Sequence, residues 1–212
     1  MIKLHLGCGK RNFPGFINVD LADFPHIHHR RAVDDLSPIA TVSVELIYAS
    51  HVFEYFSLTE VPRVLAEWRR VLKPGGILKL AVPDFTALVL AYQRFGDLRL
   101  LQGVIYGLIE PGTMQDLTLF HKVIYDFKLL KKVLEENGFT KVQTYNWQNF
   151  LEPGQEDHSA AYLPSHDYKN GILVSLNVQA EKCGALENIA SQIKHQSANF
   201  AGRVIKKVNK YL

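Results

Sequence analysis

The sequence is poor in cysteine and has no long apolar run. Its 212 residues include only two cysteines, Cys8 and Cys183, and their wide separation excludes a disulfide framework and a short-spaced metal or redox motif. This indicates a reducing compartment, with the cytoplasm as the first hypothesis. No stretch approaches the roughly 18 apolar residues of a membrane span, and the segment MIKLHLGCGK lacks the regions of an export signal. We therefore expect neither export nor a transmembrane segment.

The chain also lacks a strong charge of one sign. Its 24 basic and 21 acidic residues give a net charge of +3, and residues 182–212 alone carry +5, so the remainder is slightly acidic. No stripe rich in arginine or aromatic residues runs through that remainder, which argues against a nucleic-acid partner. With 47% hydrophobic residues, the composition is that of a globular domain with a basic appendage.

Short apolar runs with β-branched residues predict seven strands. They are Lys3–Leu6, Phe16–Val19, Arg31–Val33, Val44–Ala49, Ile77–Val82, Lys141–Tyr145 and Ile172–Ala180.

Apolar residues at helical spacing predict three helices between these strands. One spans Thr59–Leu72, with Thr59 as its cap and the turn Lys73–Gly76 at its end. The others span Asp84–Phe95 and Asp126–Asn137. Alternation of strand and helix is typical of an α/β fold with a parallel sheet. We predict one domain over residues 1–183, with an insertion at about 97–125 and a long loop at 147–171, a length usually linked to function.

A glycine turn follows the first predicted strand. Gly7 and Gly9 leave room for a ligand against the backbone, but Asn12 stands where a dinucleotide fingerprint has a third glycine. The lysine and hydroxyl of a phosphate-binding P-loop are also missing, so nicotinamide dinucleotides and nucleoside triphosphates fit poorly. A nucleoside cofactor without phosphates fits better, because Asp20 and Asp35 follow the second and third strands and can accept hydrogen bonds from ribose hydroxyls.

Four strings carry a resemblance to a known family: LHLGCGKRNFPGFINVDL, IYASHVFEYFS, LAEWRRVLKPGGILKLAVPDF and EENGF. Together they resemble the class I S-adenosylmethionine-dependent methyltransferases, in register over roughly residues 3–182. The sequence is most similar to a bacterial branch associated with surface-polysaccharide gene clusters. The resemblance implies a three-layer Rossmann-like fold whose sheet is mostly parallel and seven-stranded, with the last strand antiparallel, and S-adenosylmethionine as the cofactor.

The same resemblance implies roles for residues near the N-terminus. Gly7 and Gly9 would line the methionine portion of the cofactor, with Cys8 between them as a small packing residue of the same loop. Asp20 would bind the ribose. The link from Gly7 to Gly15 has only nine residues, too short for a full crossover helix between the first two strands.

Further along the chain, the resemblance places Asp35 and Leu36 at the adenine edge, and Ser50 with His51 beside the cofactor. Two departures from the family pattern stand out. The family usually has histidine where Tyr55 stands, which weakens a substrate-side role at that position. The stretch 37–43 also lacks the acidic turn that is common before the fourth strand.

Three histidines are candidates for a general base that would deprotonate an acceptor hydroxyl. His51 ranks first because it follows the fourth strand, where the resemblance places the reaction centre. His121 ranks second, and His158 in the long loop ranks third, with an ordinary surface role as its commoner interpretation. A separate cluster at residues 26–29 contains three histidines but no companion cysteine or carboxylate at metal-ligand spacing. We predict no metal.

The resemblance therefore indicates a methyltransferase that O-methylates a sugar or glycan precursor. The sequence does not identify which acceptor is methylated. The alternative is a non-catalytic protein of the same fold that serves as a partner in a polysaccharide assembly complex. Residues 184–212 form a basic amphipathic pattern that predicts a helix. Such a helix can lie on an anionic membrane or pack on its own domain or on a partner subunit in an oligomer, and packing is the commoner use.

Overall fold

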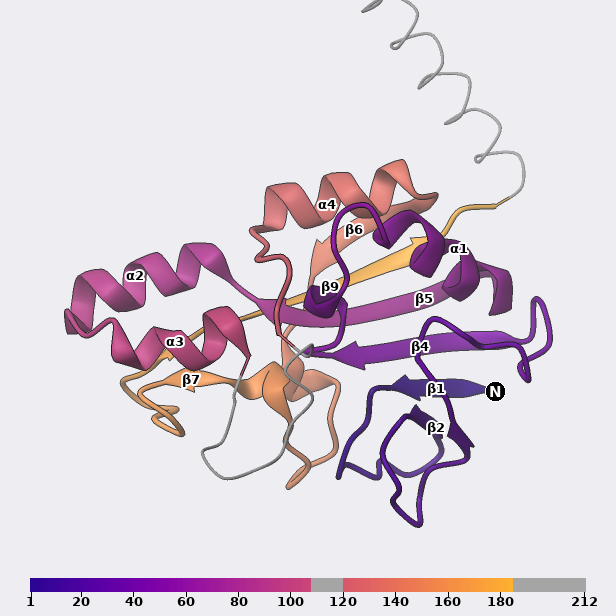
Figure 1. Cartoon of the computed structure of the whole chain (residues 1–212), viewed down its shortest axis with the longest axis horizontal. Helices are drawn as coiled ribbons and strands as arrows, with labels where there is room; N and C mark the ends of the chain where they lie inside the picture. Colours follow the sequence, from indigo (N-terminus) through magenta and orange to yellow (C-terminus); the bar gives the residue numbers. More distant parts are fainter. Residues whose placement is uncertain (108–119, 185–212) are drawn as a thin grey trace, which may run out of the picture.

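A computed structural model describes residues 1–107 and 120–184 and contains the expected seven-stranded sheet (Figure 1). The strand order is β3-β2-β1-β4-β5-β9-β6, and β9 is antiparallel to both of its neighbours while the other pairs are parallel. The strands are β1 (Lys3–Leu6), β2 (Ile17–Asp20), β3 (His29–Arg30), β4 (Val44–Ser50), β5 (Leu72–Pro83), β6 (Phe139–Thr144) and β9 (Ser175–Lys182). The prediction of a mostly parallel sheet with its last strand antiparallel is confirmed.

The described residues form four α-helices: α1 (Val61–Val71), α2 (Phe85–Phe95), α3 (Arg99–Tyr106) and α4 (Phe127–Glu136). Helices α1, α2 and α4 begin and end close to their predicted bounds, and α3 lies in the predicted insertion. Asp84 and Asp126 cap α2 and α4, because their carboxylates accept the backbone N–H groups of Thr86 and Leu129. The predicted cap Thr59 is wrong by one residue, since Glu60 is the N-cap of α1 and its carboxylate accepts the backbone N–H of Ser57.

Helices α1 and α4 pack against one face of the sheet and form the main core with it (Figure 1). The apolar stripe of α1, which includes Leu65 and Trp68, contacts strand residues such as Leu6 and Ile47. No α-helix links β1 to β2, as the nine-residue connection predicts. The connection that follows β1 is therefore a loop, which contains the glycine turn.

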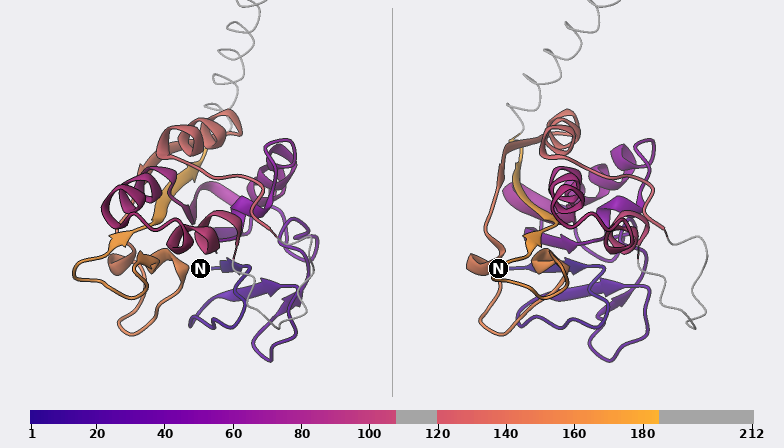
Figure 2. Two further views of the ribbon diagram at one scale, coloured as in Figure 1. Left: turned by 60° about the vertical axis from the view of Figure 1, so that its left-hand side comes forward. Right: turned by 90° about the vertical axis from the view of Figure 1, so that its left-hand side faces the viewer.

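The opposite face of the sheet is covered by the long loop rather than by an α-helix. Its aromatic cluster contains Phe13, Tyr48 and Trp147, with Phe150 also packed against it. This loop includes two short 3-10 turns, η2 (Trp147–Asn149) and η3 (His158–Ala160), and the strand β7 (Tyr162–Leu163). Figure 2 shows it, in orange, beside the indigo first strands.

Three strand predictions differ from the structure. The third strand is β3 rather than residues 31–33, because the carbonyl of Val33 accepts the indole N–H of Trp68 and this segment packs under α1. The run at 172–180 divides into β9 and the short β8 (Ile172–Leu173), which pairs with β7 in a second sheet. The predicted turn at 73–76 lies within β5.

Two predicted features lie partly or wholly outside the described residues. The insertion at about 97–125 contains α3 but also residues 108–119, and the C-terminal amphipathic segment falls almost entirely in 185–212. The division into domain and appendage therefore stays a prediction. Within the described ranges, no helix has both the length and the apolar character needed to cross a membrane.

Candidate active site at the carboxyl ends of the strands

The glycine turn is held tightly between β2 and β4. Gly7 has a φ of +64°, and a Cβ placed there would lie 2.3 Å from Cγ2 of Val52, so only glycine fits. The backbone N–H of Gly9 donates to Oδ2 of Asp20 at 2.7 Å, and the other oxygen of Asp20 accepts the N–H of Ala22 at 2.8 Å. A Cβ on Gly9 would meet open space within 4 Å. Asp20 thus fixes the turn while one side of it stays free for a ligand.

Asp35 and Leu36 lie apart from this turn. The carboxylate of Asp35 pairs with Arg31, and the backbone N–H of Ser37 lowers its pKa by hydrogen bonding. The side chain of Leu36 is buried in the core, its backbone N–H donates to Oε1 of Glu67, and its carbonyl accepts a hydrogen bond from Arg70. Their assignment to the adenine edge remains a prediction.

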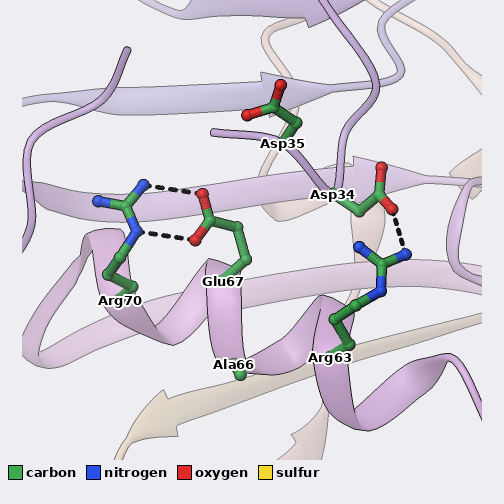
Figure 3. A pocket seen from close by; sticks show the side chains of 6 residues that line it. All are labelled: Asp34, Asp35, Arg63, Ala66, Glu67 and Arg70. Atoms are coloured by element: carbon green, nitrogen blue, oxygen red, sulfur yellow. Dashed lines mark hydrogen bonds and ion pairs between the residues drawn. The ribbon is translucent and has the colours of Figure 1, made fainter. Parts of the chain in front are cut away.

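Asp35 instead lines a shallow pocket of about 550 Å³ against α1 (Figure 3). Two ion pairs cross this pocket, Arg70 with Glu67 and Arg63 with Asp34. Because these charges already neutralise one another, the pocket offers no unpaired cation or anion to a charged ligand.

A larger cavity, of about 810 Å³, starts at the glycine turn. Its walls come from Gly7, Cys8 and Gly9, from Ser50 and His51 at the end of β4, from α3, and from the long loop. The hydroxyl of Ser50 is buried and has no hydrogen-bond partner among the described residues. The cavity therefore joins the predicted cofactor turn to the predicted catalytic residues.

His51 leaves β4 in an unusual backbone conformation. Its φ of 52° lies in the left-handed region, which costs a residue with a side chain about 1 kcal/mol. Nδ1 of His51 lies 3.2 Å from Oε1 of Glu54, and Nε2 lies 3.2 Å from Oγ of Ser175. The strained turn brings the imidazole to the cavity wall, with Nδ1 facing Glu54 and Nε2 facing Ser175.

His121 approaches the same carboxylate from a distant segment. Its Nε2 lies 3.7 Å from Oε1 of Glu54, and its Nδ1 lies 3.0 Å from the carbonyl oxygen of Val104. Burial lowers the pKa of His121, and the charge of Glu54 opposes this change. Tyr55, where the family has histidine, packs edge-on against the His121 ring with centroids 4.9 Å apart and also lines the cavity.

His158 reaches the cavity from the long loop. Its ring centroid is 5.4 Å from that of His51, and its pKa is lowered by desolvation and by the neighbouring His51. The structure thus brings all three candidate histidines to one cavity. His158 ranked last in the prediction from sequence because no local sequence pattern indicates that a loop histidine will fold back onto the sheet.

His5 also lines the cavity and was not predicted. It is buried beside Phe13, and the alternation of β1 directs it to the same sheet face as Tyr48. The alternation of side chains along β1 places His5 on the opposite face from Leu4 and Leu6, and this pattern was the available signal in the sequence that His5 faces a second core.

The remaining polar residues near the turn have structural roles. Burial raises the pKa of Cys8 to about 12, which suits a packing residue rather than a nucleophile. Nε2 of His26 lies 2.9 Å from the carbonyl oxygen of Gly9, and Nδ1 of His28 accepts the backbone N–H of Asn18 at 3.0 Å. Across residues 1–107 and 120–184, no group of three or more His, Cys, Asp or Glu side chains is arranged to hold a metal ion.

Comparison with known proteins gives a consistent result. Residues 14–80 match the family model described as a methyltransferase domain, Methyltransf_11. The chain has the class I methyltransferase fold. A 1,6-didemethyltoxoflavin-N1-methyltransferase from Burkholderia thailandensis, solved with S-adenosylhomocysteine, is 12% identical with a TM-score of 0.50, covering 86% of this chain and 71% of that one. The YcgJ protein from Bacillus subtilis is 15% identical with a TM-score of 0.50, covering 86% of this chain and 92% of that one.

A search of curated protein sequences finds no match. The family match and the fold together support an S-adenosylmethionine-dependent methyltransferase with S-adenosylmethionine as its cofactor.

Proposed function

We propose that this methyltransferase O-methylates a hydroxyl of a sugar or glycan precursor bound in the 810 Å³ cavity. The observation that carries the proposal is the continuity of this cavity, which extends from Gly7 and Gly9 to His51. A cofactor at the turn and an acceptor at the histidine would share one enclosed space, as a direct transfer between them requires.

The residues at the turn suit the cofactor. Gly9 leaves open space, Ser50 offers an unpaired buried hydroxyl, and Asp20 keeps lone pairs free because a carboxylate accepts about four hydrogen bonds. We propose that these residues hold the methionine portion and the ribose. The bound cofactor supplies an activated methyl group on a sulfonium, so the protein contributes mainly alignment and, for a hydroxyl acceptor, a base.

The acceptor side of the cavity combines aromatic and polar groups. Tyr162 and Tyr168 meet edge to face with centroids 5.2 Å apart, and the hydroxyl of Tyr168 donates to Glu156 at 2.7 Å. Flat apolar surfaces beside hydrogen-bonding groups suit a ligand that has apolar ring faces and several hydroxyls. This composition supports a sugar as the acceptor class.

His51 is the proposed base. Its Nε2 is engaged by the hydroxyl of Ser175, the kind of contact that an acceptor hydroxyl would make. We expect His51→Ala to lower turnover more than the affinity for S-adenosylhomocysteine, because a base acts mainly in the transition state. Unchanged turnover with the true acceptor would remove His51 from the mechanism and promote His121.

Calorimetric titration with S-adenosylhomocysteine tests the cofactor site. Asp20→Ala should weaken binding by about 2 kcal/mol, since a charged acceptor of two hydroxyls is lost. Asp23→Ala is the matched control, because the exposed Asp23 pairs only with Arg30. Equal binding by wild type and Asp20→Ala would show that the ribose lies elsewhere.

Methyl release with a panel of sugars and sugar-containing precursors tests catalysis. Turnover with one acceptor class identifies the substrate. Binding of S-adenosylhomocysteine without turnover across the whole panel would favour the alternative function, a non-catalytic partner in polysaccharide assembly.

A further inference from the structure

Among the described residues, Glu54 is the one buried residue of the Asp, Glu, Lys and Arg types. It lies in the 3-10 turn η1 (Phe53–Tyr55), directly after β4, and its side chain has no exposed surface. Neither carboxylate oxygen has a hydrogen-bond partner among the described residues. The groups within ion-pair distance of it are the two imidazole rings of His51 and His121.

A carboxylate removed from water in this way needs a partner that carries a proton. The fold brings both rings to it: the carbonyl of Glu54 accepts the backbone N–H groups of Lys122 and Val123, which anchors the segment that carries His121. Oε1 is the nearer oxygen to both rings, at 3.2 Å from His51 and 3.7 Å from His121. The buried carboxylate therefore lies at the centre of a three-residue cluster.

The surroundings of each ring decide where its protons lie. Nδ1 of His121 faces the carbonyl of Val104, which can only accept, so Nδ1 carries a proton. His121 thus has Nδ1 committed to a carbonyl, and its Nε2, which faces Glu54, can donate to the carboxylate only when the ring is doubly protonated.

His51 differs in its second nitrogen. With Nδ1 facing the carboxylate, a proton on Nδ1 is favoured and Nε2 is left as an acceptor for the hydroxyl of Ser175. The opposite tautomer would place a lone pair against a buried negative charge. Glu54 thus favours the form of His51 in which Nε2 can accept a proton.

We propose that Glu54 is the positioning residue of the active site, which holds His51 in the tautomer with Nε2 unprotonated. This inference rests on the proposed role of His51 as the base. It also gives His121 a supporting part in the cluster instead of a catalytic one.

The first test reads the tautomer directly and needs no substrate. Nitrogen-15 NMR of the full chain, with the His51 signal assigned by its loss in His51→Asn, should show Nδ1 protonated and Nε2 unprotonated at neutral pH. In Glu54→Met, which has no acceptor at this position, the Nε2-protonated form should gain population. A wild-type His51 protonated on Nε2 would overturn the proposal.

The second test is kinetic. Glu54→Gln removes the charge but keeps the shape, and Glu54→Met removes both oxygens. We expect turnover to fall by roughly 10²-fold in Glu54→Met and less in Glu54→Gln, with the KM for S-adenosylmethionine within twofold of wild type. Glu45→Gln, at the other end of β4 where Glu45 pairs with Lys73, is the matched control and should retain wild-type turnover.

The outcomes distinguish the positioning role of Glu54 from the methyltransferase function itself. If Glu54→Met keeps wild-type turnover, Glu54 has no positioning role even though the methyltransferase function stands. If wild type neither binds S-adenosylhomocysteine nor transfers methyl groups, the proposed function fails, while the NMR result still decides the tautomer. If Glu54→Met does not fold, the wild-type spectrum and Glu54→Gln still decide the question.

Discussion

At the residue scale, His5 is a buried base that links stability to pH. Its ring stacks on Phe13 with centroids 5.0 Å apart, only 1% of the residue is exposed, and burial lowers its pKa to about 4. In the unfolded chain, a histidine titrates near 6.5. As the pH falls from about 6.5 to 4, His5 therefore becomes protonated in the unfolded state but not in the folded state. The free energy of unfolding decreases as a result. Above pH 6.5 this loss is absent.

We expect His5→Phe to reduce that acid sensitivity. The lowered pKa of His5 corresponds to a loss of about 3 kcal/mol in the free energy of unfolding between neutral pH and pH 4. Because phenylalanine does not titrate, His5→Phe should abolish this loss. Urea unfolding at pH 7.5 and at pH 4.5 measures the effect. The control is His166→Asn, because the exposed His166 has a φ of 61° that asparagine tolerates. An equal acid loss in wild type and His5→Phe would show that other groups cause it.

At the element scale, the long loop acts as the outer layer of the sheet. The hydroxyl of Tyr48 on β4 donates to Oδ2 of Asp157 at 2.6 Å, and the amide of Asn177 on β9 donates to the carbonyl of Ser159 at 2.9 Å. These two bonds hold the turn that carries His158 against the sheet. The loop is thus positioned by polar contacts from strands that are over 15 residues away in sequence.

Tyr48→Phe tests this attachment. Loss of a hydrogen bond to a carboxylate should lower the free energy of unfolding by about 2 kcal/mol and raise the KM for the acceptor, with cofactor affinity unchanged. Urea unfolding and steady-state kinetics measure the two effects. Tyr92→Phe, at an exposed tyrosine of α2, should change neither. A raised dissociation constant for S-adenosylhomocysteine would mean that the loop also supports the cofactor.

At the scale of the whole molecule, the sheet has α1 and α4 on one face and the long loop on the other (Figure 2). The aromatic cluster packs between the sheet and this loop. Lys79 shows how closely that second layer packs: its ammonium lies 3.8 Å from the ring centroid of Tyr145, and burial lowers its pKa to about 8. The described chain ends soon after β9, where the backbone N–H of Cys183 donates to the carbonyl of Gly138.

The C-terminal segment carries a prediction for the intact chain. Its apolar stripe, from Leu186 to Tyr211, favours packing on the domain or on a partner subunit. We therefore expect truncation after Cys183 to lower the melting temperature or the solubility, although the Cys183 bond to Gly138 is kept. Wild type should not co-sediment with anionic vesicles at physiological salt. Salt-sensitive vesicle binding that is lost on truncation, without a change in melting temperature, would instead make the segment a membrane anchor.

Local features of this protein could be predicted because each depends on near neighbours in the chain. The helical spacing before Lys73, the helix starts near Asp84 and Asp126, and the nine-residue link after Gly7 are such features, and the structure agrees with each. The ordered sequence of glycine turn and strand-end carboxylates indicated a nucleoside cofactor without phosphates, and the resemblance of four sequence strings implied the methyltransferase fold.

The sequence by itself determined most of these elements and their order, because backbone preference and apolar periodicity act over a few residues. The type of cofactor followed from the resemblance of four sequence strings to a methyltransferase family. Only the tertiary structure decided which polar residues meet. Glu54 lies only three residues after His51, but His121 and His158 come from segments about 70 and about 107 residues further along the chain, and the tertiary structure brings them to the same cavity. Such contacts depend on packing across the whole sheet, which no local pattern encodes.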